Sequence, residues 1–213
     1  MTSHLPQRPK IVLEPRKWPV QARSAATVNA ILGATIQVLL GVGKQQLTTT
    51  RVAARAGVSV GTLYQYFPNK GALLQAALKR HLSAVADATE RVCREQHGHP
   101  VPQMAAALIT AFFAAKMQDP GTSVALYSVS SDVEGAKIVQ QITTRSSQAM
   151  VAMLISAKPP LSKDPHLVAS ILQGAMAGVS RRLLESGSPE KHFVSMRDEL
   201  IAFASAYLQA CCA

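Results

Sequence analysis

Few residues of this sequence are spaced for catalysis or for metal binding. The run Gly41–Lys44 has glycines and a lysine in the order of a phosphate-binding loop, but Val38 stands where that loop needs a glycine, and Gln45 follows the lysine. His97 and His99 flank a glycine in a predicted loop, which makes a poor metal site. No sequence motif of a nucleophile with its base is recognisable. The sequence therefore predicts neither an enzyme nor a bound metal or cofactor.

The positive charge of the chain is concentrated in its first part. Residues 1–80 hold eleven lysines and arginines against one acid, Glu14, so they carry the whole net charge of +10. Residues 81–213 hold equal numbers of bases and acids. A cationic unit on a neutral body favours binding to a polyanion such as DNA, because each phosphate that the protein neutralises releases counterions. A solvated basic face is the alternative, and an anionic membrane is less favoured because the bases are spread over several short elements.

Length and composition limit the class of protein. The 213 residues are 48% apolar, enough for one large domain or two small ones with a real core. We find no run of the roughly 18 apolar residues that a membrane span needs, and the polar, proline-rich N-terminus does not read as a secretory signal. Three cysteines, Cys93, Cys211 and Cys212, predict reduced thiols in a cytoplasmic protein.

Apolar residues recur at helical spacing along most of the chain. They form such a stripe between Val20 and Leu40, and Gly41 and Gly43 are expected to end this helix. Because no segment shows the alternation of a strand, the sequence predicts an all-α fold of about nine helices. The later helices are predicted at residues 69–96, 102–117, 121–130, 133–157, 165–186 and 190–210.

Two short helices are predicted between Leu47 and Phe67. Thr48 can cap the first helix, Gly57 can adopt the left-handed turn that ends it, and Ser59 can cap the second. Two short helices joined by a three- or four-residue turn with a glycine are typical of a helix-turn-helix. The second helix of such a unit presents its first residues to base edges in the major groove of DNA.

The segment 47–74 resembles the TetR family of bacterial regulators. The run AARAGVSVGTLYQYFPNK at residues 53–70 carries the resemblance closely and without a gap, whereas the last two thirds of the chain match only in length and helicity. The resemblance implies a three-helix DNA-binding domain at residues 20–68 and a helical effector-binding and dimerisation domain at residues 69–213. Residues 1–19 are predicted to form a basic flexible arm.

The candidate DNA contacts come from the helix-turn-helix pattern and from the family resemblance. Val60 can touch a thymine methyl, Gly61 lets the backbone approach closely, and Gln65 can pair with adenine. The resemblance implies a base contact at Thr50. It further implies phosphate contacts at Thr48, Thr49, Ser59, Tyr64, Tyr66 and Lys70. Tyr64 and Tyr66 could instead serve in packing, and Thr48 could serve only as a helix cap. Four bases of the arm could also enter the minor groove: Arg8, Lys10, Arg16 and Lys17.

A homodimer is implied by the resemblance, with the last two helices of each chain forming a four-helix bundle. The sequence permits this. The first of the two predicted helices carries one apolar stripe and two glycines four apart, Gly174 and Gly178, and the last helix is apolar on two sides. A wide buried face within a monomer is the alternative. The candidate interface residues are Ile171, Gly174, Ala175, Gly178, Phe203 and Tyr207.

A small-molecule effector would bind among the middle helices. Methionine and aromatic side chains suit a cavity for an apolar or weakly polar ligand, and no charged residue in this region stands out as an anchor. Ordinary core packing is the alternative for each candidate. These candidates are Phe112, Phe113, Met117, Tyr127, Met150, Met153 and Met176.

The interpretation with the most support is a sequence-specific transcriptional regulator. We expect a ligand-responsive repressor that binds a palindromic operator as a dimer. An activator of the same fold is an alternative, since the sign of regulation depends on where the operator lies. A second alternative is a non-specific architectural DNA-binding protein. The large neutral, apolar C-terminal part argues against it, because charge neutralisation alone does not need such a body.

Overall fold

The computed structural model describes residues 22–131 and 133–212. These residues form nine α-helices and no strand, apart from one isolated bridge between Leu161 and Cys212. The predicted all-α fold is therefore confirmed. The chain divides between Ala77 and Leu78 into two compact units, called here the N-terminal unit and the C-terminal unit. The division falls within a long helix, and the predicted arm at residues 1–19 lies outside the described residues.

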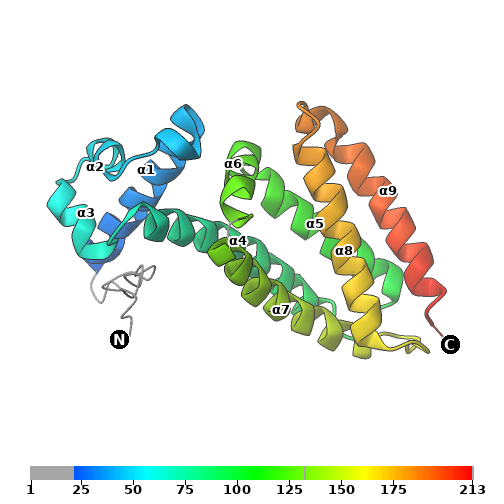
Figure 1. Ribbon diagram of the computed structural model, residues 1–213. Helices are drawn as coiled ribbons and strands as arrows, with labels where there is room; N and C mark the ends of the chain where they lie inside the picture. Colours follow the sequence, from blue (N-terminus) through cyan, green and yellow to red (C-terminus); the bar gives the residue numbers. More distant parts are fainter. Residues whose placement is uncertain (1–21, 132, 213) are drawn as a thin grey trace, which may run out of the picture. The chain divides into compact units, whose positions relative to one another are not determined.

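The N-terminal unit packs three helices and the start of a fourth around one small core (Figure 1). They are α1 (Ala22–Gln46), α2 (Thr49–Ala56), α3 (Val60–Tyr66) and the first turns of α4 (Lys70–Glu95). The regular helix is interrupted at Gly43, as expected from Gly41 and Gly43, but a further helical turn continues to Gln46 beyond the kink. Gly43 makes the kink with a φ of 74°, which glycine adopts without strain. The core residues are Ile31, Leu32, Ile36, Leu39, Leu47, Val52, Leu63, Phe67, Leu73 and Leu74.

The segment Ser24–Gln46 of α1 is long and apolar enough to cross a membrane by length and composition. This corrects the expectation that no such segment exists. The same length and apolarity are found in core helices. Here Ile31, Leu32 and Leu39 are buried, and α1 packs against α2. We therefore interpret this segment as a core helix of the N-terminal unit.

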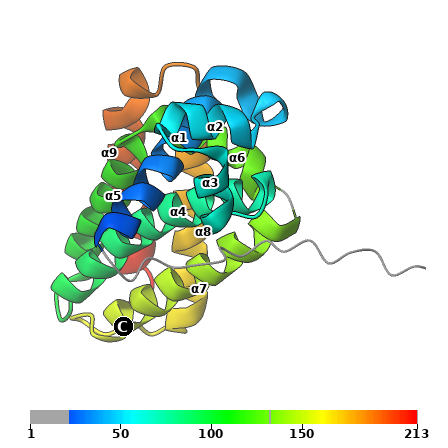
Figure 2. The ribbon, with the colours of Figure 1, turned by 90° about the vertical axis from the view of Figure 1, so that its left-hand side faces the viewer.

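The C-terminal unit contains the rest of α4 and five further helices. They are α5 (Val101–Met117), α6 (Pro120–Ser130), α7 (Val133–Ile155), α8 (Pro165–Leu184) and α9 (Pro189–Gln209). Helix α5 runs beside α9, and α8 packs against both α7 and α9 (Figure 1, Figure 2). Proline at the first position of α6 and α8 follows an aspartate whose carboxylate accepts a backbone N–H, at 2.8 Å for Asp119 and 3.0 Å for Asp164.

Candidate nucleic-acid interface and ligand cavity

Helix α3 buries one side and leaves the other open to solvent. Leu63 and Phe67 are buried in the core of the N-terminal unit. Val60, Gly61 and Tyr64 are exposed, and at a rotation of about 100° per residue they share the opposite side of the helix with Gln65. The open side is therefore the part of α3 that another molecule can reach.

Side-chain hydrogen bonds hold α2 and α3 in their relative positions. The hydroxyls of Thr49 and Tyr64 lie 3.1 Å apart and join the start of α2 to the exposed side of α3. Thr48 accepts the N–H of Arg51 at 3.2 Å, so the predicted cap of α2 is present. Gly57 ends α2 at a φ of 67°, as the turn requires. The connection is therefore the tight turn of a helix-turn-helix.

Ser59 is the N-cap of α3. Its side-chain oxygen accepts the N–H of Thr62 at 2.9 Å and lies 2.8 Å from the Thr62 hydroxyl. We predict that Ser59→Ala lowers the free energy of unfolding by about 1 kcal/mol, because a backbone N–H loses its partner. Urea denaturation of both proteins measures this. Thr50→Ala, an exposed hydroxyl inside α2, is the matched control, and an equal loss in the control would contradict the prediction.

The described part of the N-terminal unit carries bases and no acid. Its sequence from residue 24 to residue 77 contains Lys44, Arg51, Arg55 and Lys70 and neither aspartate nor glutamate. Three of these cations form hydrogen bonds within the N-terminal unit. Arg51 and Lys70 each donate to a carbonyl at the end of α1, at 3.1 Å, and Arg55 donates to the Gln37 amide at 2.7 Å. The charge remains uncompensated by carboxylates within this segment.

The predicted DNA contacts divide into two groups by exposure. Thr49, Tyr66 and Lys70 are half-buried, and Lys70 is hydrogen-bonded to α1. The remaining predicted contacts are exposed, and they lie at the start of α2 and on the open side of α3: Thr48, Thr50, Ser59, Val60, Gly61, Tyr64 and Gln65.

A cavity of about 300 Å³ lies inside the C-terminal unit. Residues of α4, α5, α6, α7 and α8 line it, and its size falls at the lower end of the range for small-molecule sites. Its apolar part includes Leu78, Leu82, Val85, Ile142 and Met150. Part of its wall is polar, and no aspartate or glutamate is among the described residues that line it.

The predicted ligand residues are only partly brought together. Phe112, Tyr127, Met150 and Met176 line the cavity. Phe113, Met117 and Met153 do not, because they point into the core around α5, α8 and α9. Phe113, for example, is fully buried and contacts the ring of Phe193, with 6.4 Å between centroids.

Lys116 corrects the expectation that no charged residue stands out in this region. It lines the cavity from the last turn of α5, and only 9% of its surface is exposed. Its ammonium lies 5.6 Å from the ring centroid of Tyr127 and 6.0 Å from that of Phe112. Burial lowers the pKa of Lys116. The sequence signal was a single cation near the end of a very apolar helix.

His81 connects α4 to α6 beside this lysine. The Ser123 hydroxyl donates to the carbonyl of Lys116 at 3.0 Å and lies 3.1 Å from Nε2 of His81. Because the hydroxyl has a single proton, His81 must be the donor in the second bond. Burial, together with the positive charge of Lys116 and Arg80, lowers the pKa of His81 from 6.5 to about 4, and Asp119 opposes this shift.

His81 should make the protein less stable in mild acid. The histidine stays neutral in the folded protein down to about pH 4, whereas in the unfolded chain it gains a proton below about pH 6.5. Stability is therefore lost as the pH falls from 6.5 towards 4, by up to about 2 kcal/mol between pH 7 and pH 5. Urea denaturation of wild type and His81→Gln at both pH values measures this. An equal loss of stability in the variant would contradict the prediction.

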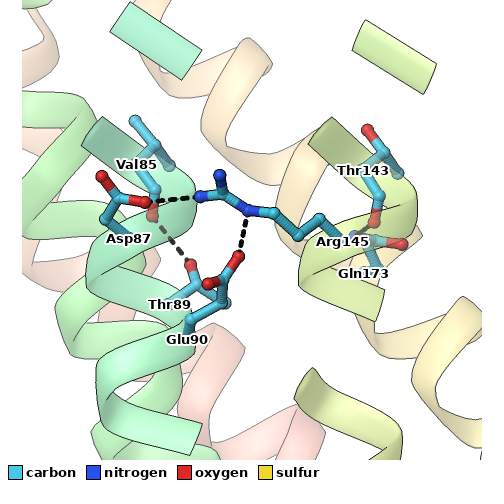
Figure 3. A network of polar contacts seen from close by, with 7 residues as sticks. All are labelled: Val85, Asp87, Thr89, Glu90, Thr143, Arg145 and Gln173. Carbon is cyan, nitrogen blue, oxygen red and sulfur yellow. Dashed lines mark hydrogen bonds and ion pairs between the residues drawn. The ribbon is translucent and has the colours of Figure 1, made fainter. Parts of the chain in front are cut away.

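A polar network ties together three helices that line the cavity (Figure 3). Figure 3 shows the guanidinium of Arg145, on α7, between the carboxylates of Asp87 and Glu90 on α4. The amide of Gln173, on α8, donates to the carbonyl of Thr143 on α7 at 3.1 Å. Arg145 and Asp87 are exposed and Glu90 is half-buried, so the ion pairs contribute little free energy, but they join α7 to α4.

The outer side of α8 and α9 exposes apolar side chains. Ile171 on α8 is 47% exposed, and Phe203 on α9 is 57% exposed. A side chain added at Gly174 or Gly178 would meet no atom within 4 Å, so both glycines face open space. Ala175 and Tyr207 are half-buried beside them. The predicted interface residues therefore belong to an apolar surface that a partner could cover.

Two family models match the chain. The model for bacterial regulatory proteins of the tetR family matches residues 31–77, which cover α2, α3 and most of α1. The model for the tetracyclin repressor-like C-terminal domain matches residues 100–208, about half of the chain. The chain belongs to the TetR family. This family consists of regulators and not of enzymes, and the resemblance found in the sequence is confirmed.

The similar proteins agree with this assignment. The HTH-type transcriptional repressor KstR of Mycobacterium tuberculosis is 44% identical over 61 residues, which are 29% of this chain and 28% of that protein. The chain thus matches less than a third of the length of this curated relative. The structure of a chain from Mesorhizobium loti, described as a TetR-family transcriptional regulator, is similar in fold, with a TM-score of 0.70 at 20% identity. The match includes 91% of the present chain and the whole of the Mesorhizobium loti chain.

A complex of SmeT with triclosan is also similar in fold. The TM-score is 0.65 at 21% identity, and the match includes 87% of this chain and 90% of the SmeT chain. SmeT is described as the repressor of a multidrug efflux pump of Stenotrophomonas maltophilia. At these identities the two structural matches show the fold alone.

Proposed function

We propose that this TetR-family chain is a ligand-responsive repressor that binds a palindromic operator as a homodimer in the cytoplasm. The observation that carries the proposal is the open side of α3. Val60, Gly61, Tyr64 and Gln65 are exposed on one side of a capped helix. This helix belongs to a unit whose residues 24–77 contain no acid.

In this proposal α3 lies in the major groove of the operator. Val60 contacts a thymine methyl, the backbone at Gly61 approaches a base pair closely, and Gln65 pairs with adenine. Hydroxyls at the start of α2 and on α3 bind phosphates and fix the register of the helix on the duplex. The hydrogen bond of Thr49 to Tyr64 supports this arrangement, because it orders two such hydroxyls side by side.

Dimerisation supplies the second half-site. A single seven-residue helix reads only a few base pairs, so specificity needs two copies about one helical turn or a multiple apart. The exposed apolar surface of α8 and α9, with Ile171 and Phe203, supports an interface between two copies of this chain. A symmetric interface of this kind predicts a palindromic operator.

Ligand binding would regulate the dimer by a population shift. The cavity of the C-terminal unit is large enough for a small molecule and is lined by α4, which continues into the N-terminal unit. A ligand that binds more tightly to a dimer unable to reach both half-sites releases the operator.

The test is a selection of operator sequences by the purified protein from random duplex DNA at near-physiological salt. The proposal expects enrichment of one palindrome with two half-sites, and a transcription assay on a promoter that carries it should show repression. Enrichment of no sequence would overturn the proposal, as would binding of single half-sites by monomers.

A further inference from the structure

The cavity has a polar wall built from linked side chains. Lys116 lies near the ring of Tyr127, and Arg181 lies over the same ring at 5.7 Å from its centroid. The hydroxyl-bearing residues Tyr127 and Ser180 also line the cavity, and His81 and Ser123 adjoin the backbone of Lys116. The other lining side chains include Leu78, Leu82, Val139, Ile142 and Met150, which are apolar. The cavity is therefore amphipathic.

The charge in this wall is positive and only partly compensated. Arg181 is exposed and forms an ion pair with Glu185 at 2.9 Å, so its charge is already satisfied. Lys116 is nine-tenths buried, and none of the described carboxylates lies within ion-pair distance of it. Asp119, one turn further along the chain, is engaged as the cap of α6 through Thr122.

Aromatic rings are weak substitutes for a counter-ion. A ring face stabilises a desolvated ammonium by about 1 or 2 kcal/mol, whereas a carboxylate within hydrogen-bond distance neutralises its charge. A buried cation is normally paired, because desolvation without a partner is unfavourable. Lys116 is thus placed to receive an anionic group from a molecule in the cavity.

The groups beside Lys116 add no second positive charge next to its ammonium. His81 is neutral at neutral pH, with its Nε2 proton donated to Ser123. The hydroxyl proton of Ser123 is donated to the Lys116 carbonyl. A single cation without a carboxylate partner matches a singly charged carboxylate better than a doubly charged phosphate. The volume of about 300 Å³ holds on the order of ten non-hydrogen atoms, at roughly 30 Å³ for each.

We propose that this cavity binds an amphipathic monocarboxylate whose anionic group pairs with Lys116 and whose apolar part fills the space between α4, α7 and α8. The inference rests on the proposed ligand-responsive function and names the class of its ligand. It differs from the sequence-based expectation of an apolar or weakly polar effector.

The test is calorimetric titration of the full-length protein with three probes of one chain length: octanoate, octan-1-ol and octylamine. Octanoate should bind wild type at least tenfold more tightly than the alcohol, and the protonated amine should bind more weakly than either. Lys116→Met should lose at least tenfold in octanoate affinity and keep its affinity for the alcohol within threefold. Lys116→Arg should keep the preference for the acid. Lys163→Met, at an exposed lysine outside the cavity, should behave as wild type.

Three outcomes would overturn the inference. They are equal affinity of wild type for octanoate and octanol, unchanged octanoate affinity in Lys116→Met, and no binding of octanoate at all. The probe comparison on wild type decides the matter even if Lys116→Met does not fold. None of these titrations contains DNA. A failed operator selection would therefore overturn the proposed function, whereas failed octanoate binding beside a selected palindrome would overturn the ligand class alone.

Discussion

Gly61→Glu should abolish operator binding without unfolding the protein. A Cβ at Gly61 would meet only the Ser59 side-chain oxygen, at 3.7 Å, which is ordinary van der Waals contact. The backbone there is helical, so a longer residue gains helix propensity and should leave the melting temperature equal or higher. On DNA the new carboxylate would stand where α3 approaches the bases. We expect a loss of affinity on the order of 100-fold or more.

Fluorescence anisotropy with the selected operator measures this affinity, and circular dichroism follows the melting. Gly41→Glu is the matched control, because it adds the same charge to the N-terminal unit at an exposed glycine of α1 with no atom within 4 Å of its Cβ. The control should bind within a few-fold of wild type. Wild-type affinity in Gly61→Glu would show that α3 does not lie against DNA.

Phe203→Asp should convert the proposed dimer into monomers. The ring is 57% exposed, so the fold of a single chain loses little on substitution. In a dimer that covers this surface, the carboxylate would be buried without a partner, which costs several kcal/mol. Monomers contact one half-site at a time, so operator affinity should fall on the order of 100-fold.

Analytical ultracentrifugation at micromolar concentration gives the oligomeric state of this variant. Val124→Asp, at a 41% exposed apolar residue of α6, is the matched control and should remain dimeric. A dimeric Phe203→Asp with full operator affinity would exclude the α8 and α9 surface as the interface.

Local signals in the sequence predicted the N-terminal unit well. Thr48, Gly57 and Ser59 cap or end their helices as expected, since capping depends on residues only two or three positions away. Gly43 interrupts α1 as expected, but the sequence did not predict the helical turn that follows it up to Gln46. That turn is held by tertiary packing, since Leu47 directly after it is buried in the core.

The ligand cavity could not be predicted in the same way. Neighbouring residues such as Phe112 and Phe113 are equally apolar, yet one lines the cavity and the other packs against Phe193. Which of the two faces the cavity depends on five helices that are distant in the sequence. The importance of Lys116 depends on burial, which needs the same tertiary packing, and a lysine near a helix end normally reads as solvated.

The measurement that tests the account most directly compares two duplexes of equal length and base composition at near-physiological salt. One carries the selected palindrome, and the other carries the same bases in scrambled order. A sequence-specific TetR-family dimer should bind the palindrome at least about a thousandfold more tightly, with two chains per duplex. Equal affinity for both duplexes, falling in parallel as salt is raised, would contradict the account and indicate binding through charge alone.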